Sequence, residues 1–379
     1  MRRLALISLL LGVVIIGIAP FKKLLPDLPL NGSEIKTMKP AFNVKDFISG
    51  KFQQDLEKFL SENIGLRGRA IIYDNQMNYS VFGDLSSKYS SKIVLGKDSW
   101  LFEKVYIDSY NGLDAISGEQ LETKVKNLGI LQKKLASYGK YCLFVITPSK
   151  VSVYPEYVKE KYLANKHVRE MTNYEKILPL LSKYNINYID GHVFMVKLKK
   201  NKIKNIYTKS GTHWSYYAAY YFTRDLLSKI EKDVNRRMAD ITCNAVTEKA
   251  VPFRHDCDLA ALSNIKYKRS FYDDLYYYPQ TTADSGKFFR PRVLVIGGSY
   301  LKMVLYYLDK HNVYLNRDFF YYYEKNSKYP EGTLGPIDKS PDNLKQLVMK
   351  KDIVLIEANE QTLFVLGYGF IEDAIKFLN

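Results

Sequence analysis

The fold is decided by Val293-Leu294-Val295-Ile296-Gly297-Gly298-Ser299-Tyr300, an apolar run that leads into two glycines and a serine. The run Arg292–Ile296 predicts a buried strand, and a helical pattern follows the serine. Glycines let the backbone turn sharply, because they have no Cβ. The start of a helix supplies N–H groups and a positive dipole end, both suited to a developing oxyanion. Ser299 is therefore a candidate nucleophile, although Gly-Gly-Ser turns are also common without any chemical role.

Strand and helix patterns alternate along most of the chain. Strands are predicted at Tyr141–Thr147, Asn187–Asp190, Arg292–Ile296, Phe319–Tyr323 and Asp352–Glu357, and Ile93–Phe102 predicts two short strands joined by a turn. Helices are predicted at Leu121–Leu135, Met171–Leu181, Trp214–Ile230, Asn343–Met349 and Phe370–Phe377. This alternation with short connections favours an α/β fold, with helices flanking both faces of a parallel sheet. Sites in such sheets gather beyond the carboxyl ends of the strands.

A second polar block, Ser210-Gly211-Thr212-His213-Trp214-Ser215, stands directly before a predicted helix. A histidine there is a candidate general base for a serine that the fold brings close. The alternative is a helix-capping loop, with Thr212 or Ser215 at the N-cap and His213 merely packed.

The N-terminus predicts a membrane anchor. Residues 4–21 carry no charge and follow Arg2 and Arg3. A helix of this length nearly spans a hydrocarbon core of about 30 Å. An uncleaved signal anchor over residues 1–21 is favoured over a cleaved signal peptide, because Pro20 would directly follow the cut. A linker at 22–45 and one α/β domain at 46–379 complete the predicted organisation.

Composition narrows the classes of partner and ligand. The net charge of +16 suits an anionic surface, but the lysines are scattered and no recognition motif is present, so nucleic-acid binding is not expected. No cluster has metal-ligand spacing, and neither a metal nor a cofactor is predicted. Cys243 and Cys257 flank a loop-like segment and would be able to pair in an oxidising compartment, although spacing alone leaves this open.

The histidine and serine blocks together resemble the AlgX/AlgJ-type SGNH-hydrolase-like proteins. Further blocks agree over roughly residues 45–365. They are Phe52-x-x-Asp55-Leu56-x-x-Phe59 with Arg67 and Asn75; Gly96-Lys97-Asp98-x-Trp100-Leu101-Phe102; Thr147-Pro148-x-Lys150 with Tyr154-Pro155-Glu156; and Asp352-Ile353-Val354-Leu355-Ile356-Glu357-x-x-Glu360. The resemblance implies an SGNH-like fold and a role in the O-acetylation of an exopolysaccharide. It also implies a domain in the periplasm, tethered to the inner membrane, and a membrane-bound O-acyltransferase as partner.

The chain departs from the family pattern at two positions. The family reads Asp-Thr-His-Trp and Gly-Asp-Ser-Phe, so the first aspartate falls on Gly211 and the second on Gly298. A histidine without its orienting carboxylate loses on the order of 10⁴-fold in rate in serine proteases. Asp190, at the end of a predicted strand, is the candidate replacement, with a plain capping role as the alternative.

The predicted function is O-acetyl transfer to a polysaccharide through an acyl-enzyme on Ser299, with His213 as base. Candidate substrate-binding residues are Thr212, Trp214, Lys150 and Tyr300. An esterase would use the same residues with water as acceptor. Two further hypotheses are not enzymatic: a glycan-binding scaffold subunit that has lost activity with its missing acids, and a membrane-tethered structural protein.

Overall fold

The computed structural model describes residues 28–32, 37–63, 66–85, 92–164, 169–284 and 286–378. The chain divides into two compact units, one formed by Met1–Ile93 with Ala260–Ser270 and the other by Val94–Leu259 with Phe271–Asn379. The sequence predicted one α/β domain from residue 46, whereas the α/β unit itself begins at Val94.

Among its described residues, the first unit includes the helices α2 (Val44–Ile48), α3 (Lys51–Asn63) and α4 (Arg67–Phe82). Asn75 is buried on α4, and its side-chain amide donates to the carbonyl oxygen of Ser263 at 3.1 Å. The Tyr79 hydroxyl at the next turn donates to Ser270 Oγ at 2.9 Å. These bonds join α4 to a segment that lies about 190 residues further along the chain.

The predicted N-terminal anchor, residues 1–21, lies outside the described residues, as does part of the predicted linker. Within the described ranges, no helix is both long enough and apolar enough to cross a membrane.

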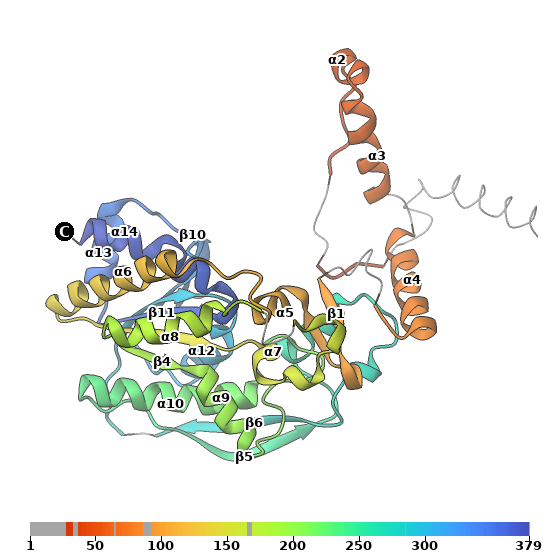
Figure 1. Ribbon diagram of the computed structural model, residues 1–379. Helices are drawn as coiled ribbons and strands as arrows, with labels where there is room; N and C mark the ends of the chain where they lie inside the picture. The colour runs from red at the N-terminus through yellow and green to blue at the C-terminus, as the bar shows by residue number, and fades with distance from the viewer. Residues whose placement is uncertain are drawn as a thin grey trace, which may run out of the picture. The chain divides into compact units, whose positions relative to one another are not determined.

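A seven-stranded sheet forms the centre of the second unit (Figure 1). Its strands are β3 (Tyr141–Thr147), β4 (Tyr188–Asp190), β7 (Arg292–Gly297), β8 (Asn316–Tyr321), β9 (Lys325–Tyr329), β10 (Leu334–Pro336) and β11 (Ile353–Asn359), in the order β10-β9-β8-β7-β11-β3-β4. The neighbours from β8 to β4 run parallel, whereas β9 and β10 pair antiparallel. The prediction of a wholly parallel sheet is therefore wrong at this edge, where short polar strands give little hydrophobic pattern to read.

Helices cover both faces of this sheet, as expected for an α/β fold (Figure 1). One face packs against α6 (Gly118–Ser137), α8 (Asn173–Lys183), α13 (Pro341–Met349) and α14 (Phe370–Phe377). The other packs against α9 (Gly191–Lys200), α10 (Tyr216–Val234) and α12 (Leu301–Lys310). Successive side chains of a strand point to opposite faces, so Phe144 and Ile146 enter the first core and Leu143 and Val145 the second.

A separate two-stranded antiparallel sheet joins β5 (Ile241–Lys249) and β6 (Tyr276–Ala283). The sequence predicted a loop-like segment between Cys243 and Cys257, whereas β5 extends to Lys249, with most of its side chains at least partly exposed. Cys243 and Cys257 are both free thiols in the structure and do not form a disulfide. Other short elements include β1 (Ile93–Leu95), β2 (Leu101–Glu103), α5 (Lys104–Tyr110), α7 (Lys150–Val153) and α11 (Asp258–Leu262).

Candidate active site

Ser299 lies between the end of β7 and the start of α12, as the sequence predicted, and is half-buried. The turn requires a small residue at its first position, because a Cβ on Gly297 would come within 2.7 Å of Glu357 Oε2 and 2.9 Å of Glu357 Cβ. The Lys302 N–H already donates to the Ser299 carbonyl oxygen at 3.1 Å. The serine therefore stands at the positive end of the α12 dipole, where amide groups have no partners inside the helix.

His213 approaches this serine from the segment before α10. Ser215 is the N-cap of that helix, and its hydroxyl accepts a hydrogen bond from the Ala218 N–H at 3.1 Å. The Ser215 N–H donates to the Ile206 carbonyl oxygen at 2.9 Å. Ser215 is therefore bonded both to the helix that it caps and to the chain before His213. His213 is 7% exposed, and its Nε2 lies 2.8 Å from Ser299 Oγ. The two blocks predicted from the sequence therefore meet at hydrogen-bonding distance.

Asp258 supplies the carboxylate beside the histidine. Its Oδ2 lies 2.8 Å from His213 Nδ1, and its Oδ1 accepts from the Thr212 N–H at 2.8 Å. An ionised carboxylate only accepts hydrogen bonds, so the imidazole carries its proton on Nδ1 and leaves Nε2 free to accept from the serine hydroxyl.

The prediction of Asp190 as the orienting acid is wrong. Asp190 is the N-cap of α9, and its Oδ1 accepts from the Val193 N–H at 3.1 Å. Its Oδ2 accepts from the Tyr174 hydroxyl at 2.9 Å. Both oxygens are used at the end of β4, and neither bonds to His213.

Gly211 explains why the acid comes from elsewhere in the chain. A Cβ at this position would lie 2.6 Å from the His255 carbonyl oxygen and 3.1 Å from the Asp256 carbonyl carbon. The space beside residue 211 is therefore filled by the backbone of the segment that carries Asp258. The sequence does contain acids in this segment, Asp256 and Asp258, but nothing in their spacing from His213 indicates that one of them contacts the histidine.

Four residues predicted to bind substrate are buried and have structural partners instead. Trp214 Nε1 donates to the Tyr300 carbonyl oxygen at 3.0 Å, and the Tyr300 hydroxyl donates to the Thr212 carbonyl oxygen at 3.0 Å. The Thr212 hydroxyl donates to Glu103 Oε1 at 2.8 Å. These three residues are at most 4% exposed. Their hydrogen bonds hold the segment that carries His213 in place, and their side chains do not face a substrate.

Lys150 is the fourth, and it is 2% exposed. Its Nζ donates to the carbonyl oxygens of Leu101 at 2.7 Å, Lys209 at 2.9 Å and Gly211 at 2.8 Å. Burial lowers the pKa of this lysine to about 7, while three carbonyl acceptors match the three N–H groups of an ammonium. Lys150 thus ties the segment before His213 to β2, and the prediction that it lines the glycan path is wrong.

Glu357 lies beneath the turn that carries Ser299. Its Oε2 accepts from the Gly298 N–H at 2.6 Å, and its Oε1 accepts from the Thr147 hydroxyl at 2.5 Å. Burial raises the pKa of this carboxyl, and the Gly298 N–H opposes that rise. Glu357 belongs to one of the family blocks, but nothing in its local sequence indicates this role.

Two tyrosines occupy the space beside Gly298, where the family pattern has an aspartate. A Cβ on Gly298 would lie 3.0 Å from Tyr322 Cε1 and 3.3 Å from the Tyr368 hydroxyl oxygen. The Tyr322 hydroxyl also donates to Ser299 Oγ at 3.4 Å. Tyrosine side chains therefore occupy the space into which an aspartate side chain at residue 298 would extend.

His255 stands edge-on to His213, with the ring centroids 5.2 Å apart. Burial, followed by the neighbouring His213, lowers the pKa of His255 to about 4. This ring is neutral at neutral pH and does not add a positive charge beside the base.

Within the described residues, His213, His255 and Asp258 form the one group of side chains able to offer donor atoms to a metal, with those atoms within 4.8 Å of one another. Both ring nitrogens of His213 already have partners, Ser299 and Asp258. A metal ion here would have to displace one of those contacts.

The sheet is covered on both faces, and serine, histidine and aspartate meet at its carboxyl edge, an arrangement that recurs among α/β enzymes of the serine-hydrolase type. Residues 93–318, more than half of the 379-residue chain, match the family model described as "SGNH hydrolase-like domain, acetyltransferase AlgX". The chain belongs to this family. No match was found among curated proteins.

Three of the solved structures that are similar to this chain are the following. The O-acetyltransferase domain of Pseudomonas putida AlgJ is 16% identical with a TM-score of 0.47, over 75% of this chain and 98% of that one. Pseudomonas aeruginosa AlgX is 12% identical with a TM-score of 0.45, over 76% of this chain and 70% of that one. Bacillus cereus PatB1 is 12% identical with a TM-score of 0.42, over 72% of this chain and 96% of that one.

Proposed function

We propose that this protein is an O-acetyltransferase that moves an acetyl group to a hydroxyl of a polysaccharide through an acetyl-serine intermediate. The observation that carries the proposal is the unbroken contact chain from Asp258 to His213 to Ser299, with both distances at 2.8 Å. Membership of a family described as an acetyltransferase supports the choice of acyl group.

The first half-reaction loads the serine. Ser299 Oγ attacks the carbonyl carbon of the acetyl donor while His213 Nε2 takes the hydroxyl proton. Asp258 keeps the ring oriented and stabilises the imidazolium. The tetrahedral intermediate then expels the donor alcohol, which leaves with the proton from His213, and the acetyl group remains on Ser299.

The second half-reaction transfers the acetyl group from Ser299 to the acceptor. His213 takes a proton from a sugar hydroxyl, whose oxygen attacks the acetyl-serine carbonyl. Collapse of the second intermediate breaks the Ser299 ester, and the proton returns to the serine oxygen. With water in place of the sugar the same residues perform ester hydrolysis, so the acceptor decides between transferase and esterase.

The hypothesis of an inactive scaffold rests on the two aspartates of the family pattern that this chain lacks. Asp258 supplies from elsewhere in the chain the carboxylate that Gly211 lacks, and this favours the catalytic proposal. Gly298 remains a departure from the family pattern, with Tyr322 and Tyr368 beside it.

Labelling with a fluorophosphonate or sulfonyl fluoride tests the proposal. We expect one adduct on Ser299, lost in Ser299→Ala and reduced at least 100-fold in rate in His213→Ala. His311→Ala, which removes a partly buried histidine elsewhere in the unit, is the matched control and should label like the wild type. An unlabelled wild-type protein, or full labelling of His213→Ala, contradicts the proposal.

Mass spectrometry then separates the two reactions. Incubation with an acetyl ester and an oligosaccharide acceptor should yield an acetylated oligosaccharide. Release of acetate without any acetylated sugar indicates an esterase instead.

The cellular location is part of the proposal. The apolar run at residues 4–21 supports an anchor in the inner membrane with the folded part in the periplasm, next to a membrane-bound O-acyltransferase. Protease treatment of spheroplasts tests this placement. Digestion of the folded part before lysis is expected, and full protection would contradict it.

A further inference from the structure

A polar cavity of about 250 Å³ opens at the same carboxyl edge of the sheet as Ser299. Residues that follow three strands of the sheet line this cavity. Ser149 follows β3, His192 follows β4 in the first turn of α9, and Glu360 directly follows β11. Ligand pockets usually hold about 300–1,000 Å³, so this cavity suits a single small ring and not a longer chain.

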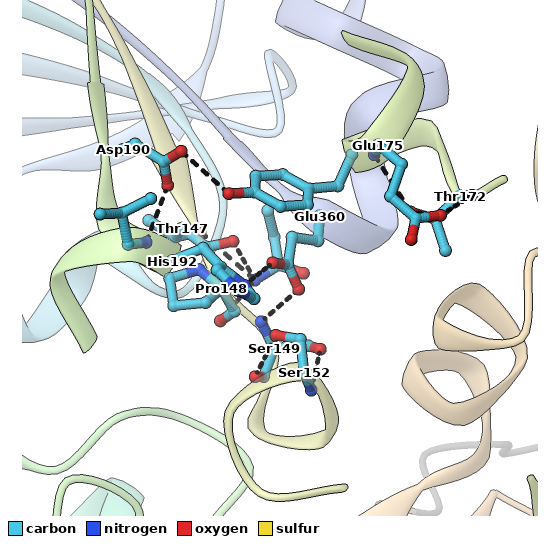
Figure 2. A network of polar contacts seen from close by, with 12 residues as sticks. Thr147, Pro148, Ser149, Ser152, Thr172, Glu175, Asp190, His192 and Glu360 are labelled. Atoms are coloured by element: carbon cyan, nitrogen blue, oxygen red, sulfur yellow. Dashed lines mark hydrogen bonds and ion pairs between the residues drawn. The ribbon is translucent and has the colours of Figure 1, made fainter. Parts of the chain in front are cut away.

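Glu360 holds the histidine of this cavity in place, as Figure 2 shows. Its Oε1 lies 2.6 Å from His192 Nδ1, and its Oε2 accepts from the Ser149 N–H at 3.0 Å. Glu360 is 6% exposed, so this pairing is fixed inside the protein. Within the described part of the chain, His192 Nε2 has no hydrogen-bond partner, and the histidine lines the cavity with that nitrogen still available.

Arg169 lines the cavity opposite an acid of α8. Its Nη1 and Nη2 each donate to one oxygen of Glu175 at 2.8 Å. Its Nε–H is buried and has no partner among the described residues. A buried donor without a partner costs free energy that a ligand oxygen would recover.

The charged residues of the lining form two pairs. Arg169 is paired with Glu175, and His192 with Glu360. The lining therefore has a net charge of zero when His192 is protonated and of −1 when it is not. Such a cavity does not attract an anion, and it favours a neutral ligand.

Hydroxyl groups and aromatic rings make up the rest of the lining. Ser149, Ser152 and Thr172 bring hydroxyls to the cavity, and Tyr110 and Tyr174 bring rings. The Tyr174 ring lies 4.7 Å from the His192 ring, and its hydroxyl is held by Asp190. Aromatic faces bordered by fixed donors and acceptors suit a ring that is apolar on its faces and hydroxylated at its edge.

The strand order places the cavity beside the serine site. Ser299 follows β7, and the cavity residues follow β11, β3 and β4, which are the next three strands. At a strand spacing of about 4.8 Å, these three strands lie roughly 5, 10 and 14 Å from β7 along the sheet edge. Distances of this size are within the length of a short oligosaccharide.

We propose that the cavity between Arg169 and His192 binds one neutral sugar ring of the acceptor chain, while a neighbouring residue of the same chain is presented to Ser299. This inference rests on the proposed function for its acceptor, and it adds the class of sugar and the place where the chain is held. His192 and Arg169 act here in binding, and neither takes part in the acetyl transfer.

Calorimetric titration of the Ser299→Ala protein tests the cavity without any turnover. The probes are tetrasaccharides of a neutral hexose, an N-acetylhexosamine and a hexuronic acid. We expect a neutral tetrasaccharide to bind best, and the additional change His192→Ala or Arg169→Met to weaken that binding at least tenfold. His311→Ala in the same background is the matched control and should bind like its parent, and circular dichroism shows which variants fold.

Several outcomes overturn the inference. They are preferential binding of the hexuronic acid, the absence of binding to both neutral probes, and unchanged affinity in both cavity variants. The two variants remove different groups, so a failure of one to fold leaves the other as the test. Because the measurement needs no nucleophile, a wild-type protein that fails to transfer acetyl groups would contradict only the proposed function.

Discussion

The Ser299 site and the Arg169–His192 cavity lie at one edge of one sheet, and each has a histidine whose Nδ1 faces a carboxylate, at 2.8 Å and 2.6 Å. They differ on the other side of the ring. Nε2 of His213 meets a serine at 2.8 Å, whereas Nε2 of His192 has no partner within the described residues. A histidine–carboxylate pair thus becomes a candidate catalytic site only where the fold also delivers a nucleophile at the start of a helix.

The largest effect that would sharpen this comparison is expected at the two candidate acids. Asp258→Asn should lower the rate of p-nitrophenyl acetate hydrolysis by about 10⁴-fold, because the amide favours the wrong tautomer of His213. Asp190→Asn is the matched control, since asparagine still caps α9 and the residue does not contact His213. Equal losses in the two variants, or none in Asp258→Asn, would break the distinction between the sites.

A second effect concerns the support of the histidine segment. Lys150→Met removes three hydrogen bonds to carbonyl oxygens and should lower the rate by about 10²-fold, because a displacement of about 1 Å at a reacting group has that cost. Lys199→Met is the control, because that lysine donates to the Val153 carbonyl oxygen and is partly exposed. Wild-type kinetics in Lys150→Met would show that the segment holds its place unaided.

A third effect concerns stability beneath the same segment. Burial raises the pKa of Asp256 to about 7 from an ordinary value near 3.8, and its Oδ1 has no partner within the described residues. The neutral acid therefore contributes stability that is fully present below pH 3.8 and is lost as the pH rises through 7, up to about 4 kcal/mol.

Asp256→Asn should remove this dependence, because an amide stays neutral. Melting temperatures of the two proteins from about pH 4 to about pH 8 provide the measurement. We expect the variant to gain on the wild type as the pH rises, and parallel curves would contradict the raised pKa.

The smallest expected effect separates the histidines by NMR titration. Burial lowers the pKa of His192, but the hydrogen bond and the charge of Glu360 raise it. The net effect is a pKa above the ordinary value of 6.5. The pKa of His255 lies near 4. Glu360→Gln should bring the pKa of His192 below 6.5, because burial then acts without the carboxylate.

The same pair contributes stability that is fully present below pH 6.5 and is lost as the pH rises through the raised value. An unchanged His192 titration in Glu360→Gln would show that the pair does not control the charge of the cavity.

The sequence alone determined the parts of this protein that depend on neighbours along the chain. Hydrophobic period and turn residues located β3 at Tyr141–Thr147, α14 at Phe370–Phe377 and the serine after β7, because these signals are local. The sequence did not predict the antiparallel strands β9 and β10, because short polar strands are stabilised by the sheet that they join and have little hydrophobic pattern of their own.

Only the tertiary structure decided which carboxylate serves the histidine and which polar residues are merely structural. Asp258 and His213 are 45 residues apart, and their contact depends on a backbone that fills the space beside Gly211. Lys150 and Trp214 are residue types that often bind ligands, but here both side chains are buried and donate hydrogen bonds to backbone carbonyl groups. Distance through space and burial are products of the whole fold, and no local stretch of sequence contains them.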